Sequence, residues 1–398
     1  MGGLARRASF LKSRGGVSCR VFAGDAIRGP GQYEQEKADL FLRFFSAMNY
    51  DAVSPGEMDL GLGAAFWRER ASRFPFFVCA NVYDAQQGKP LLRPWLLKKV
   101  RTEKGNIVRV AITGVLSAEY WPPPGLPAQM QPELALRDYV DALRQLVPKM
   151  RKEADLVVVL AHVGDAKAKE LAQAFQGIDM IIAGHTAGVT IPQTPQTGAT
   201  LVVSNGYLGR MVGEVVFRFD DKGKRIGQEA RQTGLAENMP EDKEFAELVR
   251  SFTQKWAGQP YAAVAQPTAG PFFTGAMTCQ GCHRPQYEQW RKTPHARALE
   301  PLVKSKGAKD ASNPECIRCH TLGFGKPQGY SAANKMSALL YGSVQCGHCH
   351  GAGSAHVRQP MEKSKIVRAP SEQTCLSCHS KERDPKFNYL NKLRRVRH

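Results

Sequence analysis

Four copies of one five-residue pattern, C-x-x-C-H, occupy the last third of the chain. They lie at residues 279–283, 316–320, 346–350 and 375–379. In each copy two thiols can add to the vinyl groups of one haem, and the adjacent histidine is then placed beneath the iron. The pattern therefore predicts four covalent haems c. Their attachment residues are Cys279, Cys282, Cys316, Cys319, Cys346, Cys349, Cys375 and Cys378, and their proximal ligands are His283, His320, His350 and His379.

A pair of zinc ribbons is the alternative for such a pattern, because repeated C-x-x-C pairs also form tetrahedral thiolate sites. A zinc ribbon has no need of a histidine directly after each second cysteine. This chain has that histidine in all four copies. The motifs therefore favour haem over zinc.

The histidines outside the motif ends are the candidate distal ligands. His295, His356 and His398 are well placed in sequence, whereas His348 lies inside its own attachment loop and is expected to be solvated. Three distal histidines for four irons predict three haems with two axial imidazoles, which lowers their potentials relative to His and Met ligation. The fourth iron would take Met277, Met336 or Met361, or keep an open position.

The size of the haem region indicates how it must fold. Residues 276–398 cannot build an ordinary hydrophobic core around four haems, so the porphyrins themselves should form the core. Short helices and loops would surround them. Haems packed this closely pass electrons to one another, which predicts electron transfer.

The charge of the chain is concentrated in the same region. The formal net charge is +19, and residues 276–398 carry 21 Lys and Arg against 8 Asp and Glu. Haem propionates would neutralise part of this excess; the rest would form a docking face for an acidic redox partner. Nucleic acid is not an expected partner, because binding a polyanion requires no haems. The longest apolar run, residues 156–161, is far too short to cross a membrane.

Haem attachment of this type takes place outside the bacterial cytoplasm, so we expect a periplasmic or extracellular protein. Residues 1–16 lack the apolar core of a signal peptide, which predicts that the true start lies upstream. The two remaining cysteines, Cys19 and Cys79, lie in apolar runs. Buried free thiols are the favoured interpretation, and a disulfide is the alternative.

Residues 1–235 alternate short apolar runs with amphipathic stretches, which predicts an α/β domain. A helix and a linker rich in Pro, Gly and Ala would follow at 236–275, and the haem domain would occupy 276–398. Helices are expected at 34–48, 133–152 and 241–256. Strands are expected at 17–23, 74–82, 107–116, 156–161, 180–183, 200–204 and 212–219.

Three of these strands end in polar, glycine-containing turns, where α/β proteins usually build their sites. Asp25, His162 and His185 follow the strands ending at Ala23, Ala161 and Ala183. One carboxylate and two imidazoles at neighbouring strand ends could converge on a metal ion. Hydrogen-bonded loop residues are the alternative.

These strand ends carry a resemblance. Residues 2–7, 23–25, 160–164, 182–186 and 209–210 resemble the motifs of the UshA/5'-nucleotidase branch of the calcineurin-like metallophosphoesterases, in order and spacing. The resemblance implies a four-layer αββα sandwich holding two metal ions that activate water for phosphoester hydrolysis. Asp25 would match the carboxylate that bridges the metals, and His162 and His185 would match ligands of the second.

The chain departs from that family at several ligands. Where the family has Gly-Asn-His-Glu, this chain has Ser54-Pro55-Gly56-Glu57, so an Asn ligand becomes Pro55 and a transition-state His becomes Gly56. The last ligand of the family's Gly-His-Thr-His is Ala187. None of the three replacements has a side chain that can bind a cation or donate a proton. Hydrolysis is therefore not expected, although Asp25, His162 and His185 could still hold one divalent ion.

The C-terminal region carries a second resemblance. Residues 290–296, 344–356 and 396–398, with all four motifs, resemble the tetrahaem cytochrome c family related to the electron carrier of hydroxylamine oxidation. The resemblance implies three haems with two axial histidines and one five-coordinate iron. His295, His356 and His398 would match the distal ligands.

The favoured function is electron transfer by an exported tetrahaem cytochrome c fused to an inactive phosphoesterase-like domain. One alternative is a haem oxidoreductase that acts on a small nitrogen compound at the fourth iron. Another is a metal-dependent phosphoesterase or 5'-nucleotidase with electron transfer attached.

Overall fold

In the computed structural model, the chain divides into two compact units. The first is Met1–Pro30 with Glu34–Val249, and the second is Gly31–Tyr33 with Arg250–His398. None of the described helices is both long and apolar enough to cross a membrane. The described residues are 3–16, 19–27, 32–121, 133–186, 189–190, 200–206, 209–221, 223–256, 271–304, 313–326, 329–330, 335–380 and 383–398.

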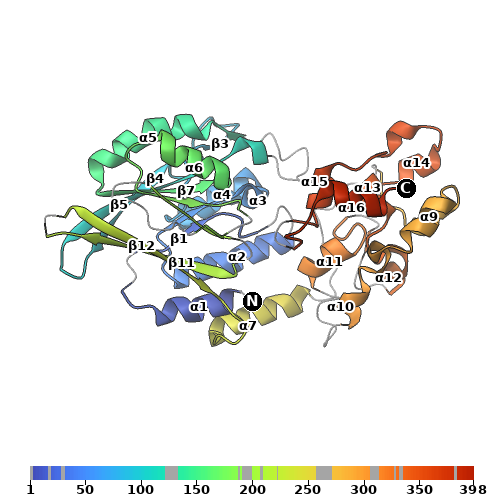
Figure 1. Cartoon of the computed structure of the whole chain (residues 1–398), viewed down its shortest axis with the longest axis horizontal. Coiled ribbons are helices and arrows are strands. Elements are labelled where there is room, and N and C mark those ends of the chain that lie inside the picture. The colour runs from blue at the N-terminus through green and yellow to red at the C-terminus, as the bar shows by residue number, and fades with distance from the viewer. Residues whose placement is uncertain are drawn as a thin grey trace. The chain divides into compact units, whose positions relative to one another are not determined.

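A six-stranded sheet forms the centre of the first unit (Figure 1). Its middle strands run parallel, and β7 (Leu156–His162) is buried at every position, as its continuous apolar sequence requires. The edge strands β4 and β9 pair antiparallel. In spatial order the strands are β4 (Trp95–Arg101), β5 (Ile107–Leu116), β7 (Leu156–His162), β8 (Met180–Ala183), β10 (Leu201–Asn205) and β9 (Val189–Thr190).

A second strand layer packs on one face of this sheet. It contains the parallel pair β1 (Val21–Ala23) and β2 (Ala52–Ser54), and the hairpin of β11 (Met211–Phe219) with β12 (Arg225–Gly234). Apolar side chains from both layers form one cluster, in which Val158 and Leu160 of the sheet meet Val21 and Phe217.

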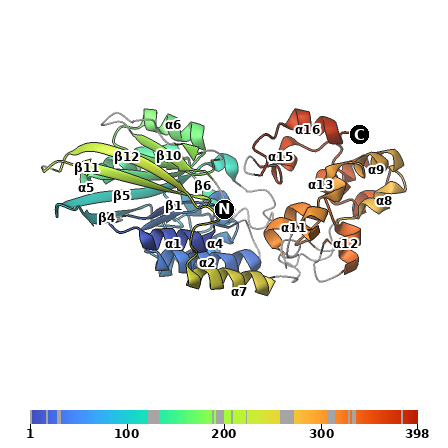
Figure 2. The ribbon, with the colours of Figure 1, turned by 60° about the horizontal axis from the view of Figure 1, so that its bottom comes forward.

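Helices cover the two outer faces (Figures 1 and 2). Leu143 and Val147 of α5 (Tyr139–Glu153) and Leu171 of α6 (Asp165–Ala174) pack on the central sheet. The opposite face is covered by α1 (Leu4–Ser13), α2 (Gln32–Ala47), α4 (Gly63–Arg73) and α7 (Lys243–Trp256), where Phe44 packs edge-on against Phe245. The expected αββα sandwich is therefore confirmed.

Three predicted elements were wrong in their bounds. The strand expected at 17–23 is β1, which begins only at Val21, and residues 19 and 20 are not in a strand. Of the strand expected at 74–82, only Val82 belongs to a strand, β3 (Val82–Asp84), while Phe77 and Val78 form isolated bridges to Val53 and Arg93. The helix expected from residue 133 begins at Tyr139, because Leu134–Leu136 instead form β6 and pair with β3. The strands β2, β4, β9 and β12 were not predicted.

Cys19 and Cys79 are both free thiols, so the disulfide alternative is wrong. Cys79 is fully buried in the core beneath the outer helices, and Cys19 packs against the cluster between the strand layers. Burial raises the pKa of Cys79 to about 11 and that of Cys19 to about 12.

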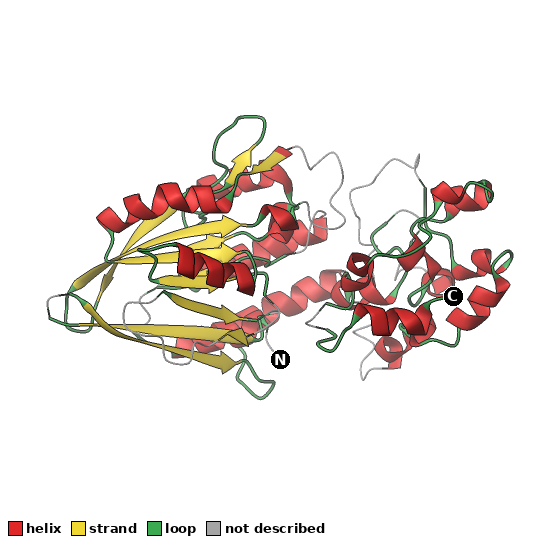
Figure 3. Cartoon of the chain, turned by 45° about the horizontal axis from the view of Figure 1, so that its top comes forward, coloured by secondary structure: helices red, strands yellow, loops and turns green. Residues whose placement is uncertain are grey.

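The second unit consists of short helices and loops (Figure 3). Among its described residues few apolar side chains are buried, and the described hydrophobic clusters all lie in the first unit. The buried ones are Tyr33, Trp256, Ala276, Ile317, Leu322 and Tyr330. A unit with so little apolar core needs another source of buried surface. Its helices are α8 (Ala276–Gln280), α9 (Arg284–Trp290), η3 (Pro294–Arg297), α10 (Glu300–Lys304), α11 (Pro314–His320), α12 (Lys335–Tyr341), α13 (Cys346–His350), α14 (Ser354–Arg358), η5 (Lys363–Lys365), α15 (Glu372–Leu376) and α16 (Tyr389–Val396).

Candidate haem and metal sites

Each C-x-x-C-H motif lies at the end of a short helix, which brings its two cysteines and its histidine to one side of the chain. The motifs begin in or at α8, α11, α13 and α15. His350 Nδ1 donates to the carbonyl oxygen of Val367 at 2.7 Å, and His320 Nδ1 donates to that of Ala298. His379 Nδ1 lies 3.0 Å from Asp384 Oδ2. These bonds orient the rings and leave Nε2 available to a metal, as is usual for metal-ligating histidines.

Three of the four motif histidines face a second imidazole. The ring centres are 6.2 Å apart for His283 and His356, 5.8 Å for His379 and His295, and 5.6 Å for His350 and His398. An ion bound to two imidazoles by bonds of about 2.0–2.1 Å separates ring centres by roughly 6 Å. His356 Nδ1 is moreover buried with no hydrogen-bond partner. These residues therefore fit a haem iron held between two histidines.

His320 is different, because no imidazole in the described part of the chain is seen to face it. Of the methionines considered as its partner, Met277 is 63% exposed and Met361 is 89% exposed, and the side chain of Met336 lies outside the described residues. The geometry thus distinguishes the second motif from the other three.

The expectation that His348 is solvated was wrong. His348 Nδ1 accepts from the backbone N–H of Gln345 at 3.0 Å, and its Nε2 lies 3.1 Å from the carbonyl oxygen of Thr321. Burial lowers the pKa of this ring to about 4. His348 is therefore a neutral structural residue that ties its attachment loop to the loop after α11.

Cysteines from different motifs lie next to one another. The sulfur of Cys279 is within hydrogen-bonding reach of that of Cys346, and Cys319 and Cys378 are related in the same way. The first motif is thus adjacent to the third, and the second to the fourth.

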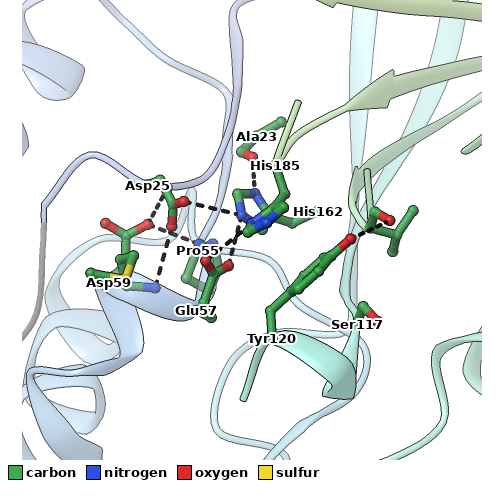
Figure 4. Close-up of polar contacts among 12 residues, drawn as sticks. Ala23, Asp25, Pro55, Glu57, Asp59, Ser117, Tyr120, His162 and His185 are labelled. Atoms are coloured by element: carbon green, nitrogen blue, oxygen red, sulfur yellow. Dashed lines mark hydrogen bonds and ion pairs between the residues drawn. The ribbon is translucent and has the colours of Figure 1, made fainter. Parts of the chain in front are cut away.

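In the first unit, the strand ends bring Asp25, His162 and His185 together, and Glu57 joins them (Figure 4). One ligand atom from each of the four lies within 4.8 Å of all the others. Asp25 follows β1, His162 ends β7, and His185 follows β8. Glu57 begins α3 (Glu57–Leu60), directly after β2.

His162 is the buried centre of this cluster, with a side chain only 1% exposed. Its Nδ1 lies 2.8 Å from the carbonyl oxygen of Ala23, and its Nε2 lies 2.9 Å from Glu57 Oε2 and 3.3 Å from Asp25 Oδ2. A Cβ atom at Gly184 would lie 2.5 Å from His162 Nδ1, so only glycine permits this packing. Burial opposes a charge on His162, but Asp25 and Glu57 outweigh it and hold its pKa well above its usual value.

Sequence reasoning did not select Glu57, whose neighbours in the motif are replaced. Its carboxylate is buried, and Oε1 lies 3.1 Å from His185 Nδ1. Burial disfavours its ionisation, but the adjacent imidazoles of His162 and His185 hold its pKa at about 2. Glu57 is therefore an anion inside the protein, facing both histidines.

His185 is positioned by Tyr120, whose ring stacks on it at 3.7 Å and 10°. The Tyr120 hydroxyl donates to the carbonyl oxygen of Val163 at 3.2 Å. Both His185 and Asp25 have left-handed backbone conformations, with φ of 54° and 60°. Few residues other than glycine adopt such conformations, and those that do concentrate at functional sites.

The space beside Gly56, where related enzymes carry a histidine, is already filled. A Cβ atom at Gly56 would lie 2.1 Å from Asp25 Oδ1, so the Asp25 side chain fills that space.

Asp59 accepts hydrogen bonds from the backbone N–H groups of Gly56, Asp25 and Ile27 at 2.7–3.0 Å. Burial, and then the charge of Asp25, raise its pKa to about 7. Ala187 lies outside the described residues.

The layers and strand-end residues of the first unit define a calcineurin-like metallophosphoesterase fold. The 5'-nucleotidase precursor from Thermus thermophilus superposes with a TM-score of 0.53 at 24% identity, covering 64% of this chain and 53% of its own. The snake venom 5'-nucleotidase of Gloydius brevicauda is 24% identical over 273 residues, which is 61% of this chain and 44% of that protein. The first unit is therefore a 5'-nucleotidase-like domain.

Part of the second unit is similar to cytochrome c554. Residues 278–351 match the family described as cytochrome c554 and c-prime. Cytochrome c-554 of Nitrosomonas europaea is 36% identical over 93 residues, which is 20% of this chain and 39% of that protein. The chain thus spans less than half the length of either of these curated relatives.

Proposed function

We propose that this chain is an exported c-type cytochrome that carries four covalent haems and transfers electrons. The three facing histidine pairs are the observation that carries the proposal, because their ring spacing of 5.6–6.2 Å suits an iron between them. His283 pairs with His356, His379 with His295, and His350 with His398. The eight motif cysteines attach the haems, which supply reversible one-electron chemistry when bound.

The neighbouring cysteines support a transfer route. The first and third haems are attached side by side through Cys279 and Cys346, and the second and fourth through Cys319 and Cys378. Electrons pass within each pair and then between pairs. The basic region 276–398 provides the docking face for an acidic redox partner, whose encounter is accelerated by complementary charge.

The first unit serves this cytochrome without hydrolysing phosphoesters. Pro55 and Gly56 supply no ligand and no acid, and the Asp25 carboxylate occupies the space beside Gly56. Asp25, His162 and His185 hold at most one divalent ion. Incubation of the purified protein with a nucleotide or a model phosphoester and manganese, zinc or cobalt should give no cleavage. Metal-stimulated cleavage that is lost on Asp25→Ala would establish the esterase alternative.

Haem quantitation and electron paramagnetic resonance test the cytochrome proposal, after co-expression with a c-type maturation system. The pyridine haemochrome should give four haems per chain. The resonance spectrum should contain three low-spin signals and one high-spin signal. A chain with zinc and no haem would refute the proposal.

A second candidate function is favoured by the second motif. Because no described imidazole faces His320, the iron above it has a coordination position open to a small nitrogen compound, such as nitric oxide or hydroxylamine. Turnover of such a compound would make the protein a haem oxidoreductase. Steady-state assays with each compound, and with an electron donor or acceptor, should separate turnover from simple binding.

A further inference from the structure

We propose that Glu57 is a metal ligand, and that it completes with Asp25, His162 and His185 a site for one divalent transition-metal ion. The inference rests on the part of the proposed function that allows one ion in the first unit. In place of the dinuclear centre of the related esterases, this chain would have a mononuclear site with a different ligand set.

Two buried atoms without hydrogen-bond partners carry the inference. Glu57 Oε2 and His162 Nε2 are both buried and have no hydrogen bond, although only 2.9 Å separates them. The backbone carbonyl of Ala23 can only accept, so His162 Nδ1 is the donor in their contact at 2.8 Å. Nε2 and Oε2 then lie close together without sharing a proton in a hydrogen bond. A cation bound to both satisfies both.

The remaining ligands are held by the fold. Glu57 Oε1 faces His185 Nδ1 at 3.1 Å, and Asp25 Oδ2 lies 3.3 Å from His162 Nε2. The strained backbone at Asp25 and His185, and the stacking of Tyr120 on His185, fix the outer two side chains. The Ala23 carbonyl orients His162, as outer hydrogen-bond partners orient ligating histidines elsewhere.

The loss of the asparagine ligand at position 55 explains why Glu57 would bind the metal ion. Pro55 cannot supply the amide oxygen of the related enzymes, and the carboxylate of Glu57, two residues later, lies among the cluster's ligand atoms instead. Asp59 is not available for a second ion, because its oxygens accept three backbone N–H groups. Within the described ranges no other group of His, Cys, Asp and Glu has this compactness.

The donor set indicates the class of metal. Two imidazoles with two carboxylates suit manganese, iron or zinc, whereas calcium and magnesium prefer oxygen ligands alone. The Asp25 and His185 side chains are 31% and 37% exposed, while those of Glu57 and His162 are 5% and 1% exposed. An ion can therefore enter from the side of Asp25 and His185.

Manganese binding to the full-length holoprotein tests the inference. Protein stripped with a chelator is titrated with Mn²⁺, and free ion is measured by its six-line resonance at room temperature. One ion per chain is expected. Glu57→Gln keeps the size of the side chain but removes its charge, and it should weaken binding at least tenfold. Glu119→Gln is the matched control, because Glu119 is an exposed carboxylate outside the cluster, and it should bind as the wild type does.

Three results would overturn the inference: no stoichiometric ion in the wild type, two ions per chain, or unchanged affinity in Glu57→Gln. If Glu57→Gln fails to fold, Glu57→Asp replaces it, keeping the charge with a shorter reach, and should also bind more weakly. Asp25→Asn, which retains a residue suited to a left-handed backbone, should lower the affinity independently. Pyridine haemochrome on the same samples reports the haems, so a failure of the cytochrome proposal is distinguishable from a failure of the metal site.

Discussion

The imidazole of His356 lies 6.2 Å from that of His283, with only 29° between the ring planes, although 73 residues separate them in the sequence. The buried Nδ1 of His356 has no other partner. His348 is much closer to His356 in the sequence, but both of its ring nitrogens form hydrogen bonds to the backbone. The two histidines of this region therefore have different roles, and mutation can separate them.

Substituting His356→Met should raise the midpoint potential of one haem in four and leave the haem content unchanged. The reason is that a methionine in place of a distal histidine favours the reduced iron. His348→Gln is the control, and it should leave all four potentials in place while lowering thermal stability. Spectroelectrochemical titration measures both variants. Unchanged potentials in His356→Met would exclude His356 as a ligand.

The reduced protein should bind one carbon monoxide per four haems. In the proposed tetrahaem arrangement, histidines hold three irons on both sides, and no imidazole among the described residues faces His320. Titration with carbon monoxide, followed in the Soret band, gives the stoichiometry. Saturation with no spectral change would mean that a further residue closes the fourth site, and binding at several irons would contradict the histidine pairs.

Much of the fold was predictable for strands that are buried on both faces of the sheet. The expected bounds of β5 and β8 agree with the structure, because β8 is an uninterrupted apolar run and β5 is apolar at most of its positions. The hairpin strand β12 was missed because its sequence, Arg-Ile-Gly-Gln-Glu-Ala-Arg-Gln-Thr-Gly, is largely polar and is stabilised by pairing with β11 along its whole length. Residues 134–136 were assigned to a helix because their pairing with β3 is a long-range contact that local periodicity does not encode.

The site residues were predictable only where a sequence motif or a strand end indicated them. Strand-end position was enough to select Asp25, His162 and His185, which the structure brings together. Glu57 was missed because a glutamate at the start of a helix is usually solvated, and only burial shows that its carboxylate points inward. Likewise, spacing along the chain did not indicate which distal histidine faces which motif.

Cys19 and Cys79 should be the only cysteines that an alkylating reagent can modify, and only after unfolding. Burial raises their pKa to about 12 and about 11, so at pH 8 the reactive thiolate of Cys79 is about 0.1% of the total. Mass spectrometry after iodoacetamide treatment should show no adduct on native holoprotein and two adducts in denaturant. More than two would mean that some motif cysteines are not bonded to haem.

Restoring a histidine at the esterase position should not restore an esterase. In Gly56→His the new Cβ would lie 2.1 Å from Asp25 Oδ1, so Asp25 must move and the surrounding backbone with it. Overpacking of this kind costs about 1–3 kcal/mol of stability. Thermal unfolding of the first unit should therefore shift to lower temperature, with no phosphoester cleavage in the presence of manganese.

Gly234→His is the matched control for this variant, because a Cβ at Gly234 meets no atom within 4 Å and the residue lies at the end of β12. It should unfold close to the wild-type temperature. Equal stability of the two variants would show that Asp25 is free to leave the space beside Gly56. Cleavage by Gly56→His, or by Pro55→Asn combined with it, would show that the first unit retains the remaining parts of a hydrolytic centre and lost its activity through these two positions alone.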